Sequence, residues 1–126
     1  MVRTIKILLV LLAVLFTSLA MRWLVSPAGV APEFGFELAH GLGRSTQIGD
    51  LFAFFLTSSL CMLIGVVRTD RVWLYPPLFL FALAIVGRLV AWLVHDAAFA
   101  AAQLAVEFIS VVVLLVALRL FPSRTA

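Results

Sequence analysis

Four long hydrophobic runs make up most of the chain, and short polar segments separate them. The runs cover about residues 5–25, 50–67, 74–94 and 98–120. Each is long enough to cross about 30 Å of hydrocarbon as a helix that rises about 1.5 Å per residue. The pattern predicts an all-α fold, an integral membrane four-helix bundle that forms a single transmembrane domain over residues 1–126.

The polar separators contain residues that end helices. Ser26-Pro27 follows the first run, residues 68–71 divide the second from the third, and His95-Asp96 predicts a tight turn before the fourth. Residues 26–49 are rich in Pro and Gly and predict an outward loop, in which residues 33–38 form a short interfacial segment with aromatic anchors.

The N-terminus has a second interpretation. Arg3 and Lys6, the apolar residues 7–16 and then Ser18-Leu19-Ala20 are typical of a secretory signal with a small-x-small cleavage site. Hydrophobicity resumes through residues 23–25, as a span would need. We therefore predict a retained first span, with a cleaved signal as the alternative.

The composition excludes a soluble catalytic domain. Hydrophobic residues form 65% of the chain and charged residues 12%, against about 45–50% and about 25% in soluble domains. The net charge is +3, but the basic residues lie at helix ends, where they set topology, so we expect no nucleic-acid partner. The single cysteine, Cys61, excludes an internal disulfide.

The distribution of basic residues predicts the orientation. One side of the four spans carries six of them, whereas the other side carries Arg44 in a loop and Arg22 at the membrane edge. The positive-inside rule then places both termini in the cytoplasm of a bacterial-type inner membrane and the loop 26–49 outside. The six are Arg3, Lys6, Arg68, Arg71, Arg119 and Arg124.

Four ionisable residues lie in or beside the spans, and all four fall in the predicted outer half. They are Arg22, Asp50, Arg88 and Glu107, and their charges sum to zero. Arg88 is the most informative, because an arginine deep in a membrane span costs roughly 2.5–3.5 kcal/mol and is usually kept for a partner or a function. Small residues beside it predict a tight hairpin of the third and fourth spans, with Arg88 and Glu107 as an ion pair.

Helical spacing extends these residues into polar stripes. Gln103, Glu107 and Ser110 share a face of the fourth span. The candidate polar cluster is therefore Arg22, Asp50, Arg88, Gln103 and Glu107, with possible contributions from Thr57, Ser58, His95 and Ser110. We expect a polar, charge-balanced interior in the outer half and a dry cytoplasmic half.

The same residues carry a family resemblance. Arg22-Trp23-Leu24 with residues 27–30, Gly49-Asp50-Leu51-Phe52, Gly87-Arg88-Leu89 and Glu107 resemble a widespread family of small bacterial four-helix membrane proteins of unknown function. That family is similar in architecture to the DoxX-like membrane proteins. The resemblance covers nearly the whole chain and implies a four-helix fold in which these charged positions belong to the family pattern, but it implies no activity.

Three functions are compatible with the cluster. The first is a non-catalytic protein whose outer-half pocket binds a small amphipathic ligand or lipid head group. The second is an accessory subunit of a larger inner-membrane complex, in which the arginine–acid pairs serve only helix packing. The third is a transporter or membrane-enzyme component. No nucleophile with a base, metal-ligand set or cofactor motif is evident, so we expect no catalytic residues, metal or cofactor, and membrane lipids, a small ligand or other membrane subunits as partners.

Overall fold

The computed structural model describes residues 1–124, and every regular element in that part of the chain is helical. The long helices are α1 (Val2–Val25), α3 (Gly41–Arg68), α4 (Tyr75–Val94) and α5 (Ala101–Leu120), joined by the shorter α2 (Pro27–Val30), η1 (Ala31–Phe34) and η2 (Arg71–Leu74). Four helical segments, with η2 and α4 taken together, are long and apolar enough to cross a membrane. The predictions of an all-helical fold and of four helices long and apolar enough to span a membrane are confirmed.

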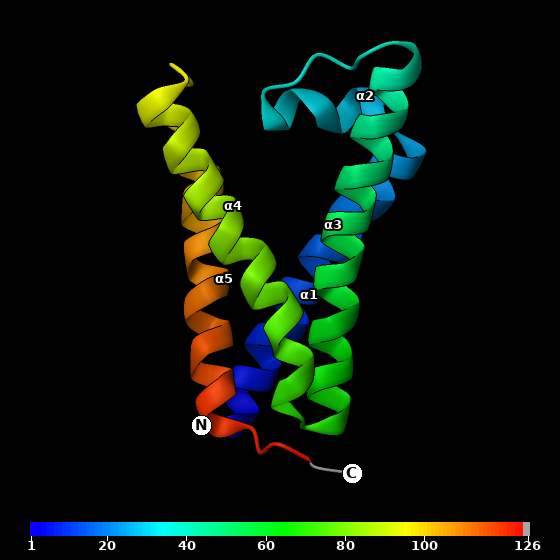
Figure 1. Cartoon of the computed structure of the whole chain (residues 1–126). Coiled ribbons are helices and arrows are strands. Elements are labelled where there is room, and N and C mark those ends of the chain that lie inside the picture. Colours follow the sequence, from blue (N-terminus) through cyan, green and yellow to red (C-terminus); the bar gives the residue numbers. More distant parts are fainter. Residues whose placement is uncertain (125–126) are drawn as a thin grey trace.

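The long helices pack together at one end of the molecule and diverge towards the other (Figure 1). The closed end carries the N-terminus, residues 121–124 and the connection from α3 to α4. The open end carries residues 26–40 and 95–100. Because α1 packs along α3 and α4 packs along α5, the structure consists of two helical pairs. The compact bundle expected from the sequence is present only at the closed end.

The core lies where the helix pairs meet. α1 buries one residue every three or four positions, as a helix with one packed face must. Phe16 of α1 contacts Phe55 of α3 and Phe81 of α4, with ring centroids 5.8 Å and 4.8 Å apart. These aromatic contacts join the two helical pairs halfway along their length. The buried residues of α1 are Ile5, Leu9, Ala13, Phe16, Ala20 and Trp23.

Hydrogen bonds and close side-chain packing stabilise the closed end. The backbone N–H of Arg71 donates to the carbonyl of Pro122 at 3.1 Å, and Asp70 Oδ1 accepts from the N–H of Val72 at 3.1 Å. Leu74 packs so closely on α3 that a Cβ placed on Gly65 would lie 2.7 Å from Leu74 Cδ2. An alanine at position 65 would therefore require the fully buried Leu74 side chain to shift.

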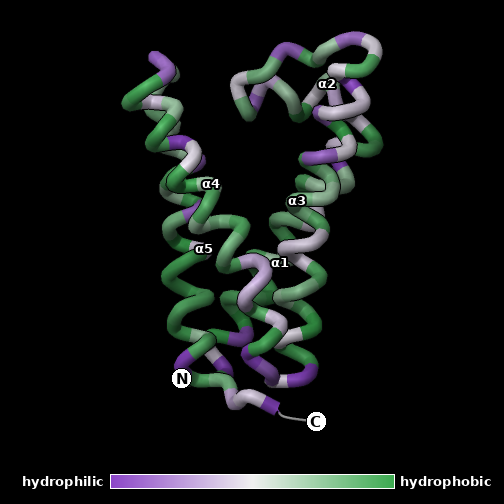
Figure 2. The backbone as a smooth tube through the Cα atoms, viewed as in Figure 1, coloured by the Kyte–Doolittle hydropathy of each residue, from purple (hydrophilic) through white to green (hydrophobic). Residues whose placement is uncertain are grey.

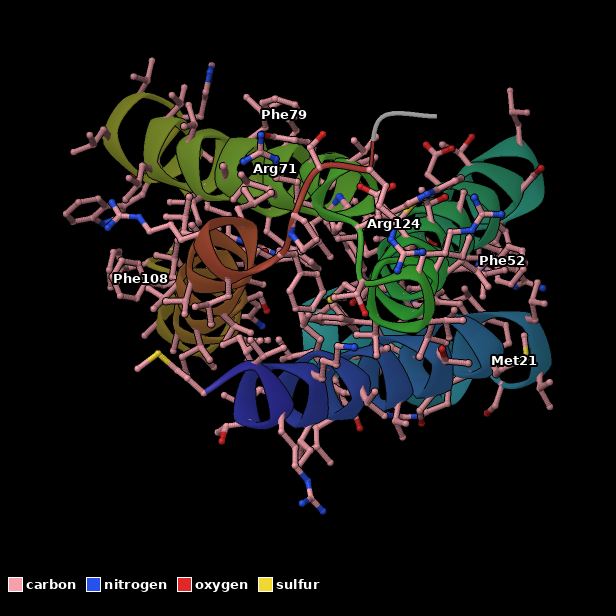
Figure 3. All side chains as sticks on the ribbon, turned by 90° about the horizontal axis from the view of Figure 1, so that it is seen from below. Met21, Phe52, Arg71, Phe79, Phe108 and Arg124 are labelled. Carbon is pink, nitrogen blue, oxygen red and sulfur yellow. The ribbon has the colours of Figure 1, made fainter. Side chains whose placement is uncertain are left out.

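The outward sides of the helices are apolar. Phe79 of α4 and Phe108 of α5 point away from the other helices (Figure 3) and are 58% and 62% exposed. Hydrophobic residues dominate the middle of all four long helices, and hydrophilic residues gather towards the ends (Figure 2). This distribution suits a surface that faces lipid.

The second span begins earlier than the sequence predicted. α3 starts at Gly41 rather than near Asp50, so the connecting loop covers residues 26–40 and itself contains α2 and η1. Loop contacts stabilise the polar start of the helix: Gln47 accepts from the N–H of Ala39 at 2.9 Å, and Arg44 Nε donates to the carbonyl of Ala39 at 2.9 Å. At about 1.5 Å per residue its 28 residues span about 42 Å, more than the roughly 30 Å of hydrocarbon.

The turn before the fourth span is longer than predicted. α5 begins at Ala101 rather than Ala98, and residues 95–100 are not helical. Asp96 adopts a positive φ of 56°, and Phe99 packs edge-on against Trp92 with ring centroids 4.9 Å apart. Both features belong to a connection between α4 and α5 that is longer than a tight turn.

Candidate functional site

A cleft of about 350 Å³ lies between the two helical pairs, on the open-end side of the aromatic core. Residues of α1, η1, α3, α4 and α5 line it, so every long helix contributes. Most of the lining is apolar, and six phenylalanines supply much of it. They are Phe16, Phe34, Phe36, Phe54, Phe55 and Phe81; the polar lining residues are Glu33, Arg88, Gln103 and Glu107.

The predicted ion pair lies in the cleft wall. Arg88 Nε donates to Glu107 Oε1 at 2.8 Å, which joins α4 to α5. The side chain of Arg88 is 34% exposed and that of Glu107 only 8%. A buried carboxylate is stable in its charged form only with a partner, so the arginine compensates the burial of Glu107. The pairing of Arg88 with Glu107 is confirmed.

Arg22 does not form the second ion pair of the predicted cluster. That pair would have joined it to Asp50 of the second span. Its two Nη atoms donate to the two carboxylate oxygens of Glu33 at 2.8 and 2.9 Å. The chain turns back after α1 at Pro27, and Phe34 packs on Trp23 with ring centroids 5.9 Å apart, which brings η1 over the end of α1. The hydrogen bonds from Arg22 lower the pKa of the Glu33 carboxyl below its ordinary value.

Asp50 lies outside the site. It is exposed on α3 and does not line the cleft, because the face of α3 towards the cleft carries Leu51 and Phe54 instead. The interior of the open half is therefore largely aromatic, whereas the sequence predicted a mainly polar one. Glu33 and the phenylalanines were missed as site residues.

The other predicted contributors also lie away from the cleft. Ser58 and Ser110 are buried, and their hydroxyls donate to the carbonyls of Phe54 and Val106 in their own helices at 2.8 Å each. Thr57 and His95 are exposed and do not line the cleft. Hydroxyls bonded within their own helix have no need of a further partner.

Gln103 links the two sides of the cleft. Its Nε2 donates to the backbone carbonyl of Glu33 at 3.4 Å, so α5 touches η1 near the open end. At this distance the hydrogen bond is weak, because it is longer than the usual range of about 2.7–3.2 Å. The two residues are 70 positions apart in the sequence. They meet because η1 lies over the end of α1.

The ion pair leaves hydrogen-bonding capacity unused. Among residues 1–124, Glu107 Oε2 is buried and has no hydrogen-bond partner. Arg88 uses Nε in the ion pair, and no described residue accepts from its two Nη groups. Buried polar atoms without partners are uncommon in folded proteins and call for an explanation. In this case the unused groups belong to two residues that line one cleft.

Among residues 1–124, no group of three or more His, Cys, Asp or Glu side chains is arranged to hold a metal ion.

Comparisons with protein-family models, with curated proteins and with solved structures each find no match to this chain.

Proposed function

We propose that the protein is a multi-pass membrane protein that binds a small amphipathic molecule or lipid in its cleft and does not itself catalyse a reaction. One observation carries this proposal: an aromatic cleft of about 350 Å³ contains one charged pair, Arg88 and Glu107, with unused hydrogen-bonding groups. Ligand sites commonly have volumes of about 300–1,000 Å³, mostly apolar walls and a few polar groups. The phenylalanines would hold the apolar body and the ion pair the head group.

The charge distribution supports an outward-facing cleft. The six basic residues of the predicted cytoplasmic side fall at the closed end, which holds the start of α1, the ends of α3 and α5 and the start of η2. By the positive-inside rule the closed end would face the cytoplasm of a bacterial-type inner membrane, and the cleft would open in the outer half of the bilayer. The ligand would then enter from the outer leaflet or the space beyond it.

The packing of the closed end argues against a pore. Leu9, Met62, Leu74 and Leu114 are fully buried there, and they come from four different segments. A transport path needs polar groups or a water-filled channel from side to side. The same feature favours binding over transport as the role of the cleft.

An accessory role in a larger membrane complex is the second candidate. Within α4 only Pro77 and Phe81 are buried, so most of this helix is free to face lipid or another subunit. In this case a helix of the partner would cover α4, and the cleft would have no ligand of its own.

The test compares two alanines of α5. Both are exposed, but only Ala102 lines the cleft. Wild type, Ala102→Phe and Ala105→Phe would be purified in mild detergent, and the lipids that remain bound would be extracted and quantified per protein. We expect wild type and Ala105→Phe to retain a lipid that Ala102→Phe has lost. Equal lipid contents in all three would contradict the proposal, and a subunit that co-purifies with all three, without a bound lipid, would favour the accessory role.

A further inference from the structure

We infer that the cleft selects an electrically neutral amphiphile with a hydroxyl head, such as a single-chain or ring-bearing alcohol, over an anionic one. The inference rests on the proposed ligand-binding function and specifies the chemical class of its ligand. It follows from the charge balance of the cleft, from the unused polar atoms of its ion pair and from its size.

The charges at the cleft are already balanced. Arg88 pairs with Glu107 at 2.8 Å, and Glu33 on another wall pairs with Arg22. An anionic head group would have to displace Glu107 from the guanidinium or lie beside a carboxylate in a poorly solvated cleft. Both arrangements are costly where the surroundings are apolar and the effective dielectric constant is low. A neutral head group avoids this repulsion.

The unused polar atoms of the ion pair favour a ligand that can both donate and accept a hydrogen bond. Glu107 Oε1 accepts one hydrogen bond, and Oε2 accepts none from the described residues. A carboxylate offers about four acceptor positions, and an arginine offers five N–H donors. A hydroxyl at this wall would accept from a free Nη of Arg88 and donate its proton to the Glu107 carboxylate, whose buried Oε2 has to turn towards the cleft to receive it. A ketone, ether or carboxylate cannot make the second hydrogen bond.

The rest of the cleft fits a single apolar body. Phe34 of η1, Phe54 of α3 and Phe81 of α4 provide aromatic walls, and aromatic surfaces suit chains and rings alike. A volume of roughly 350 Å³ lies near the lower end of the range for ligand sites, about 300–1,000 Å³, and therefore suits one small apolar chain or ring system.

The test uses three probes of equal chain length: 1-dodecanol, which donates and accepts, dodecyl methyl ether, which only accepts, and dodecanoate, which is anionic. Their binding to detergent-purified protein at neutral pH is measured by native mass spectrometry, with the probes in pairwise competition at equal concentrations. A hydrogen bond to a charged group contributes enough to separate the alcohol from the ether by about tenfold or more. We expect the alcohol to bind more tightly than dodecanoate by the same factor.

Two variants connect this preference to the cleft. Glu107→Gln leaves the charge of Arg88 unpaired, so we expect dodecanoate to become the preferred probe. Ala102→Phe, in contrast to Ala105→Phe, should abolish binding of all three. Because the wild-type comparison needs no substitution, a Glu107→Gln protein that does not fold leaves the test intact.

The outcomes separate the inference from the proposed function. If Ala102→Phe abolishes binding but the wild type holds the ether as tightly as the alcohol, or dodecanoate more tightly, the hydroxyl inference is overturned and ligand binding stands. If no probe binds, or if Ala102→Phe binds all three as the wild type does, the proposed function fails as well.

Discussion

Arg88 Nε lies 2.8 Å from Glu107 Oε1, although the two residues are 19 positions apart in the sequence and belong to different helices. Their surroundings differ: about a third of the arginine side chain is exposed, whereas the carboxylate is almost fully buried. The buried Glu107 carboxylate therefore needs the charge of Arg88 as compensation, whereas the partly exposed Arg88 guanidinium has less need of Glu107.

Arg88→Leu should lower the free energy of unfolding by about 2–4 kcal/mol, because it leaves the buried Glu107 carboxylate without a partner. The double variant Arg88→Leu with Glu107→Leu should recover at least half of that loss, because it removes the unpaired charge as well. Chemical unfolding in detergent measures both values. A double variant no more stable than Arg88→Leu would show that Glu107 is not the source of the instability.

The charge-swapped protein, Arg88→Glu with Glu107→Arg, separates architecture from ligand binding. It preserves the pair but exchanges which side chain is buried. We expect partial recovery of folding relative to each single change, as coupled partners require, together with loss of lipid retention. Full recovery of both would favour a purely architectural pair.

The sequence predicted the contact between Arg88 and Glu107 for a physical reason. A charge within an apolar run must find an opposite charge, and the short connection after the third span makes the fourth its nearest neighbour. The partner of Arg22 could not be found in this way. Glu33 lies in a Pro-containing segment, and its position depends on the packing of Phe34 on Trp23, a tertiary contact that local patterns do not encode.

The aromatic lining of the cleft was not predictable from hydropathy either. Phe54 and Phe81 have the same apolar character whether they face lipid, a core or a cleft. What distinguishes them is the divergence of the two helical pairs towards the open end (Figure 1). The start of α3 was misjudged for a related reason, since its glycines indicated a loop whereas contacts from residues 37–39 stabilise a helix.

Gly65→Ala should destabilise the closed end by about 1–3 kcal/mol, because the new Cβ would lie 2.7 Å from a buried leucine, Leu74, and overpacking costs this much. Gly87→Ala is the matched control, since a Cβ at that position meets nothing within 4 Å. It should stabilise α4 by about 0.5–1 kcal/mol through helix propensity. Thermal unfolding of the two variants in detergent provides the comparison, and similar shifts for both would refute the close contact.

Glu33 should give the stability a measurable pH dependence. Its pKa is lowered in the folded protein by the hydrogen bonds from Arg22. A lowered carboxyl pKa contributes stability that is present above the unfolded-state pKa and is lost as the pH falls through the folded-state pKa. The wild type should therefore be slightly more stable than Glu33→Gln near neutral pH, and the difference should disappear in acid. The effect is small because the pair is exposed to solvent.

Melting temperatures of the two proteins, measured from neutral pH to below the ordinary carboxyl pKa, show this convergence. Glu37→Gln is the control, because Glu37 is exposed on the same loop and forms no ion pair with another described residue. A difference between wild type and Glu33→Gln that stays constant down to the lowest pH would contradict the role of the Arg22 contact.

The orientation of the cleft can be decided with topology reporters. Alkaline phosphatase is active only outside the inner membrane, and green fluorescent protein exported in unfolded form does not fluoresce there. With six basic residues at the closed end, we expect a fluorescent protein fused after Ala126 to fluoresce and a phosphatase inserted after Ala97 to be active. The opposite pattern would place the cleft on the cytoplasmic side. The ligand would then have to come from the inner leaflet, and Arg88 and Glu107 would select among cytoplasmic lipids.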